Sequence, residues 1–167
     1  AHAWVSGPMV EVVQNSTQYL SVADLTAMAT YLQARARAHL LADDVPNPSP
    51  RAPTQRASQR GAVLYDDHCA VCHGKQGEGV AQAYPALAGN WAVQMPHTTN
   101  LVQTVLYGGY PPATAGNPRP FGMPPYILTL DDKDIAAVLT HLRSQWGHRS
   151  PEVTPLEVHR IRASQGS

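Results

Sequence analysis

Two cysteines and a histidine near the middle of the chain are the residues best suited to hold a metal-containing cofactor. They form the pentapeptide Cys69-Ala-Val-Cys72-His73, which has the spacing of a c-type haem attachment motif. In such a motif the two sulfurs add to the vinyl groups of the porphyrin and become thioethers, and the adjacent imidazole binds the iron from one side. The motif uses both cysteines of the chain, and it predicts one covalently bound haem c.

Two other uses of a cysteine pair fit the sequence less well. A structural zinc site needs four ligands, but the chain has one cysteine pair, and the spacing of His68, His73 and His97 matches no common zinc motif. A thioredoxin-like pair belongs to a βαβ context, whereas this motif follows a helical pattern and precedes a glycine-rich loop. We therefore favour haem c over a zinc site or a thiol redox site.

His73 is the expected proximal ligand because it directly follows the second cysteine, so the other axial ligand must come from farther along the chain. Met123 is the best candidate, since it lies 50 residues after His73 between a glycine and two prolines. Such a loop can approach a haem closely and hold a thioether in place. His/Met ligation is common in cytochromes c and raises the reduction potential. Met95 and His97 are alternative ligands, and Met123 could instead fill the core.

Three further side chains are candidates to bind the haem propionates. Arg119 lies four residues before Met123, and a guanidinium can pair with a carboxylate through two hydrogen bonds. Trp91 and Tyr107 can donate an N–H or an O–H, although such residues also serve as packing. A surface position for Arg119 and core packing for the two aromatic residues are the alternatives.

Composition and charge limit the classes of protein to which the chain can belong. The 167 residues include 12 Lys and Arg and 12 Asp and Glu, so the formal net charge is zero and nothing favours nucleic-acid binding. No apolar run reaches the length of about 18 residues that suggests a transmembrane helix. The first residues lack the features of a secretory signal. Because haem c is normally attached outside the cytoplasm, we expect a periplasmic protein whose signal was removed, or a part of a longer precursor.

Helical periodicity and breaker residues divide the chain into four parts. These are a helical segment (1–45), a proline-rich linker (46–55), a mono-haem domain (56–148) and a polar tail (149–167) that wraps the surface or docks on a partner. Helices are expected over residues 22–41, 57–69, 100–107 and 131–146. Ser21 followed by Asp24 resembles a capping box at the start of the first of these helices. The elements predict an all-α fold.

Two of the expected helices resemble each other in sequence. Residues 20–32 align without gaps with residues 130–142, and each copy follows a methionine flanked by glycine and proline, Met9 in the first and Met123 in the second. The second copy closes the haem domain, so we interpret residues 1–45 as the end of a preceding haem domain whose attachment motif is not in this sequence. Chance similarity between two capped amphipathic helices is the alternative.

Together these features make residues 56–148 resemble a class I cytochrome c domain, an all-α fold in which N- and C-terminal helices cross around a covalent haem. Gly61 and Tyr65 stand eight and four residues before the first cysteine, where this family places a small and an aromatic residue against the C-terminal helix. Pro85 stands twelve residues after His73, at the family proline whose carbonyl accepts the histidine N–H. The resemblance thus implies that Pro85 orients the proximal ligand.

The whole chain is similar to the C-terminal part of the multi-haem cytochrome subunit of bacterial membrane-associated alcohol, gluconate, sorbitol and aldehyde dehydrogenases. The similar stretches include residues 7–13, 84–90 and 119–126. In that family three haem domains pass electrons in series towards quinone or another cytochrome, but this chain has one C-x-x-C-H. If residues 1–45 end a second haem domain, Met9 is an axial ligand of that haem. Otherwise they are a packing arm.

The motif and the resemblance imply an electron carrier rather than an enzyme in its own right. The iron would cycle between Fe(II) and Fe(III), and the expected partner is a dehydrogenase subunit, another cytochrome or a quinone-linked protein. The contact would be small and transient, as redox encounters usually are. The alternative is a haem enzyme, or a domain that binds gas or peroxide, and it would require Met123 to leave the iron.

Overall fold

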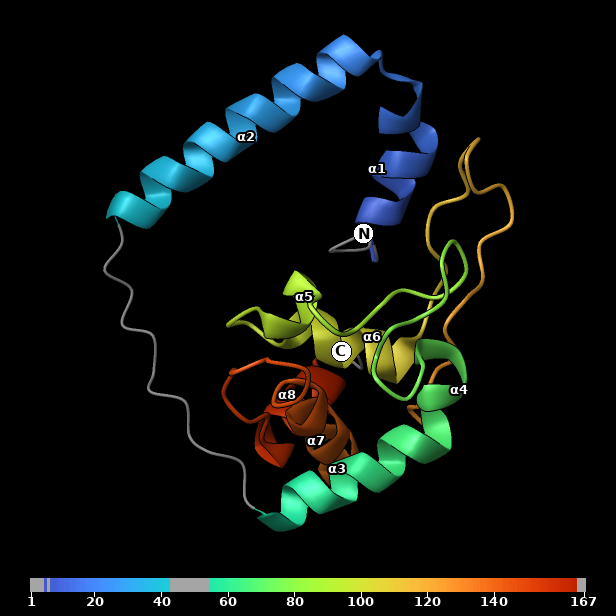
Figure 1. The fold of residues 1–167 in the computed structure, drawn as a ribbon, viewed down its shortest axis with the longest axis vertical. Coiled ribbons are helices and arrows are strands. Elements are labelled where there is room, and N and C mark those ends of the chain that lie inside the picture. Colours follow the sequence, from blue (N-terminus) through green and yellow to red (C-terminus); the bar gives the residue numbers. More distant parts are fainter. Residues whose placement is uncertain (1–4, 6, 43–54, 165–167) are drawn as a thin grey trace.

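The computed structural model describes residue 5 and residues 7–42 and 55–164, and its regular elements are helices (Figure 1). They are α1 (Met9–Asn15), the 3-10 helix η1 (Thr17–Tyr19), α2 (Val22–Ala42), α3 (Gln55–His68), α4 (Ala70–His73), α5 (Trp91–Gln94), α6 (Thr99–Tyr107), α7 (Asp132–Leu142) and α8 (Pro155–Ala163). The described residues contain isolated β-bridges but no strand. The all-α class expected from the sequence is confirmed.

The hydrophobic core lies where α3 crosses α7. Helix α7 begins at Asp131, whose carboxylate accepts the N–H of Asp134 at 2.8 Å and so satisfies one of the free N–H groups at the helix start. Every position of α7 from Ile135 to Thr140 is buried. Leu64 and Tyr65 of α3 are buried in the same core. This packing fixes the end of α3, which leads directly into the cysteine motif.

Helix α7 ends at Leu142, four residues before the end expected from the sequence. The backbone N–H and the hydroxyl of Ser144 both donate to the carbonyl of His141 at 3.0 Å, so this carbonyl is satisfied without a further helical turn. Arg143 is 1% exposed. Its guanidinium donates to three backbone carbonyls, those of Val93, Met95 and Pro151. The chain therefore turns inward where the periodicity suggested another helical turn.

The segment expected to be a polar tail contains the helix α8. Thr154 caps it, and a reciprocal pair of bonds between Thr154 and Glu157 forms a capping box, with Pro155 in the first turn. Val158 is fully buried, and α8 packs against both α6 and α7. Residues 155–163 are thus part of the folded domain.

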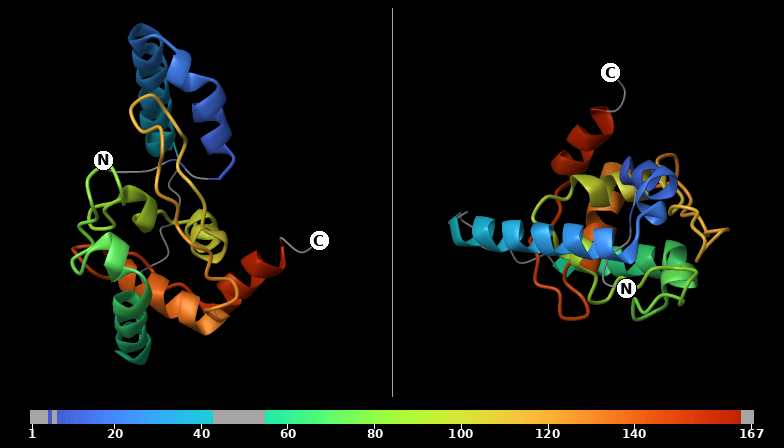
Figure 2. Two further views of the ribbon diagram at one scale, coloured as in Figure 1. Left: turned by 90° about the vertical axis from the view of Figure 1, so that its right-hand side faces the viewer. Right: turned by 90° about the horizontal axis from the view of Figure 1, so that it is seen from above.

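The N-terminal helices lie apart from the helices of residues 55–164 (Figures 1 and 2). The expected cap of α2 is confirmed, because the Asp24 N–H donates to the Ser21 hydroxyl at 3.2 Å. All positions from 22 to 36 are exposed. Apart from Gln55, which begins α3, the expected linker lies outside the described residues. Within the described ranges, no helix has the length and hydrophobicity needed to cross a bilayer.

Candidate haem site

The two cysteines and His73 lie on one helical turn that directly follows α3. The N–H of Cys69 donates to the carbonyl of Tyr65 at 2.9 Å, and the N–H of His73 donates to the carbonyl of Cys69 at 2.9 Å. The short helix α4 therefore continues from the end of α3 with a small break at Cys69. Cys69, Cys72 and His73 all line one pocket, which is the arrangement that the motif requires.

The imidazole of His73 is oriented by Pro85, as the family resemblance implied. His73 Nδ1 lies 2.9 Å from the Pro85 carbonyl oxygen, and a carbonyl can only accept, so Nδ1 carries the proton. The lone pair is then on Nε2, the nitrogen available to a metal. Burial lowers the pKa of His73 below its ordinary value, although the Pro85 carbonyl acts in the opposite direction. The side chain is therefore a neutral imidazole at neutral pH, the form that binds iron.

Met123 is held against the end of α6 by its own backbone. Its N–H donates to the carbonyl of Gly109 at 2.8 Å, and its carbonyl accepts the N–H of Gly109 at 3.0 Å. The Met123 backbone can come this close to the end of α6 only because position 108 is a glycine. Its φ is +63°, and a Cβ there would lie 2.2 Å from the Met123 carbonyl oxygen. Met123 lines the same pocket as the cysteines and His73.

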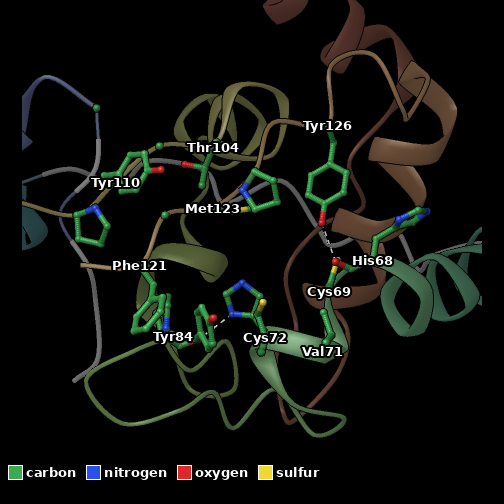
Figure 3. Close-up of a pocket in the computed structure, with 18 of the residues that line it drawn as sticks. His68, Cys69, Val71, Cys72, Tyr84, Thr104, Tyr110, Phe121, Met123 and Tyr126 are labelled. Atoms are coloured by element: carbon green, nitrogen blue, oxygen red, sulfur yellow. Dashed lines mark hydrogen bonds between the residues drawn. The ribbon is translucent and has the colours of Figure 1, made fainter. Parts of the chain in front are cut away.

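Aromatic side chains enclose this pocket (Figure 3). Figure 3 shows Met123 across the pocket from the cysteine-bearing turn, with Tyr84 and Phe121 at one end and Tyr126 and His68 at the other. The rings of Tyr84 and Phe121 have their centroids 5.4 Å apart. The Tyr126 hydroxyl donates to the His68 carbonyl at 2.7 Å, which ties the Met123 loop to the end of α3.

Sequence reasoning did not single out several of the residues that line the pocket. Among them are Tyr84, Thr104, Tyr110, Phe121 and Tyr126. A signal for two of them was present, because Phe121 and Tyr126 flank Met123 within three residues and Phe121 is the single phenylalanine of the chain. Aromatic residues next to a candidate axial ligand are well suited to pack on a flat macrocycle.

The pocket fits the prosthetic group that the motif implies. None of the described lining residues is an Arg, Lys, Asp or Glu, so the surroundings suit an apolar ring. Both cysteines are among the lining residues, as two thioether links require, and the neutral imidazole of His73 and the thioether-bearing Met123 line the same pocket. Imidazole and thioether are the axial ligands of His/Met-ligated cytochromes c.

The properties of Cys69 argue against the two alternative uses of the cysteine pair. Burial, reinforced by the nearby Cys72, raises the pKa of Cys69 to about 11, so the group is a neutral thiol at neutral pH. Reactive redox cysteines have a lowered pKa instead. The described residues also contain no group of three or more His, Cys, Asp and Glu side chains that could hold a metal ion.

The structure does not bring all of the candidate residues to this pocket. Met123 lines it, whereas the following candidates are absent from its described lining: Arg119, Trp91, Tyr107, Met95 and His97. Arg119 and His97 are exposed, and Trp91 is 63% exposed. A role of Arg119, Trp91 and Tyr107 towards the propionates therefore stays a prediction.

Comparison with known proteins points to the same family as the cysteine motif. Residues 58–146 match the family model described as cytochrome c. The chain is 36% identical to the cytochrome c subunit of a quinone alcohol dehydrogenase from Gluconacetobacter polyoxogenes, over 96% of this chain and 36% of the relative. It is 32% identical to the cytochrome c subunit of a gluconate 2-dehydrogenase from Pantoea cypripedii, over 98% of this chain and 38% of the relative.

These two relatives are much longer than the chain, which spans little more than a third of their length. A shorter relative is matched over most of its own length. It is cytochrome c-552 from Thermus thermophilus, 31% identical over 65% of this chain and 78% of the relative. The motif, the pocket and the match over residues 58–146 lead to one conclusion: the chain belongs to the cytochrome c family.

Proposed function

We propose that the chain is an electron-transfer domain with one covalent haem c, attached through Cys69 and Cys72 and ligated by His73 and Met123. The haem iron supplies the redox chemistry by alternating between Fe(II) and Fe(III). One observation carries the proposal: both cysteines, His73 and Met123 line a single pocket without charged residues in its described lining. The hydrogen bond from His73 to Pro85 keeps the imidazole in the tautomer and orientation that iron binding requires.

Met123 is favoured as the second axial ligand by its position and by the support of its loop. Its backbone N–H and its carbonyl both form hydrogen bonds with the backbone of Gly109. His97 is exposed, and the half-buried Met95 is held through its carbonyl by Arg143 at 2.8 Å. Neither Met95 nor His97 lines the pocket. A ligand in a fixed loop can hold the iron in the same coordination in both oxidation states, which suits an electron carrier.

The lining of the pocket supports a carrier over a haem enzyme. Turnover of peroxide requires an open iron position and a nearby group that moves protons. Among the described lining residues there is no carboxylate or guanidinium, and His68 is at the end of α3, beside the cysteine-bearing turn. Arg119, the charged residue four positions before Met123, is exposed and outside the described lining.

The wider role that we propose is electron relay within a dehydrogenase complex. Relatives that align with at least 96% of the chain are cytochrome subunits of quinone alcohol dehydrogenase, gluconate 2-dehydrogenase and fructose dehydrogenase. The proposed partners are a dehydrogenase subunit, another cytochrome or a quinone-linked protein. The proposed location is the periplasm, with membrane association through partners, because covalent attachment of haem c normally takes place outside the cytoplasm.

We also propose that residues 1–45 end a preceding haem domain. In α7 the apolar residues that face the core are almost completely buried, and in α2 the residues aligned with them are exposed. The pairs are Ile135 (0% exposed) and Leu25 (41%), Val138 (2%) and Met28 (46%), and Leu142 (5%) and Leu32 (62%). A helix with such a stripe normally packs against a partner. The partner that fits α2 is the N-terminal helix of that preceding domain, as α3 fits α7.

Met9 is the proposed axial ligand of the haem in that preceding domain. It is 54% exposed and does not line the pocket of Met123, so it is free to serve another site. Like Met123, it lies between a glycine and a capped helix of related sequence.

A pair of variants of the haem-loaded chain tests the axial ligand and the carrier role together. Met123→Ala should abolish the weak far-red absorption band typical of methionine-ligated ferric haem and should allow rapid binding of carbon monoxide to the reduced protein. The matched variant Met95→Ala should keep the band and bind carbon monoxide slowly, like the parent chain. Rapid carbon monoxide binding by the parent itself would instead support the enzyme or gas-binding alternative.

A further inference from the structure

The helix α8 lies beyond the part of the chain that matches the cytochrome c family model, which ends at residue 146. It is nevertheless firmly attached to the domain. Val158 is fully buried, and Glu157 accepts a hydrogen bond from the hydroxyl of Thr98, the residue that directly precedes α6. Helix α8 thus lies outside the matched region and contacts α6, and Met123 is held against the end of α6. Through this contact α8 could act on the loop that carries Met123.

Arg162 of α8 reaches the segment that joins Met123 to α7. Its Nη1 donates to the Ile127 carbonyl at 2.8 Å, and its Nη2 donates to the Leu130 carbonyl at 3.0 Å. Its Nε donates to the carboxylate of Asp132 at 2.7 Å. The side chain of Arg162 is 24% exposed, so the interactions are partly shielded from water. One guanidinium therefore holds two carbonyls of the segment and the first residue of α7, a geometry that only its planar fork of donors can supply.

The other end of the same segment is fastened to α6. Besides the two bonds between Met123 and Gly109, the N–H of Tyr126 donates to Val105 at 3.1 Å and the N–H of Ile127 donates to Leu106 at 3.0 Å. The backbone from Met123 to Leu130 is thus held by α6 at its start and by Arg162 at its end. Release of a ligand in such a segment requires local opening, and its frequency depends on these bonds.

We infer that α8 is a brace for the axial-ligand loop, and that Arg162 is a positioning residue that controls how often Met123 leaves the iron. The inference rests on the proposed His73/Met123 ligation. The hydrogen bonds of Arg162 go to Ile127, Leu130 and Asp132, which are not among the described lining residues of the pocket, so Arg162 acts through them. Loss of these charge-assisted bonds should make opening of the loop more frequent by about tenfold or more.

The test measures the rate at which imidazole binds to the ferric, haem-loaded full chain at saturating imidazole, where binding is limited by departure of Met123. Arg162→Ala should bind about tenfold faster than the parent. Arg162→Lys should be intermediate, because an ammonium can pair with Asp132 but cannot serve both carbonyls. The matched control is Arg160→Ala, which removes an exposed arginine of the same helix and should bind at the parental rate.

The possible results separate the brace from the ligation on which it rests. If the parent lacks the far-red band of methionine ligation, the proposed ligation is wrong and the brace is wrong with it. If the parent has the band but Arg162→Ala and Arg160→Ala bind imidazole at equal rates, the brace alone is wrong. Should Arg162→Ala fail to fold, Arg162→Lys decides the question by the same comparison with Arg160→Ala.

Discussion

Gly61 of α3 lies so close to Ala137 of α7 that one added methyl group would overlap the backbone of α7. A Cβ at Gly61 would be 2.2 Å from the Ala137 carbonyl oxygen and 2.7 Å from the Cβ of His141. The two helices can cross at this separation because position 61 has no side chain. Their crossing supports the end of α3, from which Cys69 and His73 follow, so a glycine outside the pocket lining helps to position the residues proposed to bind the haem.

Gly61→Ala is therefore expected to destabilise the haem-loaded domain. Overpacking in a core costs about 1–3 kcal/mol, and alanine regains up to about 1 kcal/mol through its higher helix propensity. The net loss in free energy of unfolding should be on the order of 1–2 kcal/mol, measured by denaturant titration. Gly116→Ala is the control, since a Cβ there meets nothing within 4 Å. Equal stability of the two variants would show that the helix crossing tolerates a side chain.

Replacement of the sulfur ligand by an imidazole should change the reduction potential in a known direction. Methionine raises the potential relative to bis-histidine ligation, so Met123→His should lower the midpoint by on the order of 0.1 V or more, measured by redox titration. The same change at the competing position, Met95→His, should leave the midpoint close to that of the parent. A large shift of the midpoint for Met95→His, with no shift for Met123→His, would show that Met95 and not Met123 is the axial ligand.

The half-buried His141 should make stability depend on pH below neutrality. Burial lowers the pKa of His141 below its ordinary value of 6.5, while the charge of Asp66 acts in the opposite direction. The unfolded chain therefore binds a proton at this residue more readily than the folded chain does. Stability contributed by the neutral imidazole is complete above pH 6.5 and falls as the pH drops from 6.5 towards the lower folded pKa.

This dependence is measured on the haem-loaded protein, in which the proposed ligation of iron would prevent His73 from titrating. The free energy of unfolding should fall between pH 7.5 and pH 5.5, and His141→Gln should reduce that fall. If the free energy of unfolding of His141→Gln falls as steeply as that of the parent, His141 does not contribute.

The proposed role of Met9 is tested in a longer protein that includes the preceding haem domain. Met9→Ala should remove the far-red band of one haem and leave the haem of Met123 unchanged, because each methionine would serve a different iron. Met95→Ala in the same protein should alter neither haem. If both haems are unchanged in the Met9→Ala protein, Met9 is not a haem ligand, and residues 1–45 are a packing arm.

The parts of the structure that could be predicted from the sequence are those with a strong local signal. Helix α7 has an apolar stripe of Ile135, Val138, Leu139 and Leu142 and an aspartate cap at Asp131, so its helical periodicity and its first residue can be predicted from the sequence. The attachment motif predicts the roles of Cys69, Cys72 and His73 from residue type and spacing alone. Met123 could be chosen because its glycine allows close approach to a haem and its prolines stiffen the loop, and Met123 lines the pocket.

Other features depend on contacts between distant residues and have little local signal. In α8 one residue, Val158, is buried, so the helix has almost no periodic apolar face, although Thr154 and Glu157 with an intervening proline form a recognisable capping box. Arg143 is buried among backbone carbonyls, a position that an arginine seldom takes. Neither Arg143 nor the contacts of Arg162 could be found from residue spacing, because their partners are 8 to 50 positions away.

The most direct measurement is the mass of the chain under denaturing conditions, after expression with the machinery that attaches haem c. Covalent attachment through Cys69 and Cys72 predicts the polypeptide mass plus one haem and no thiol available to an alkylating reagent. Cys69→Ser with Cys72→Ser should return the mass of the bare polypeptide. A parent chain that is colourless, with the unmodified mass and two reactive thiols, would contradict the account.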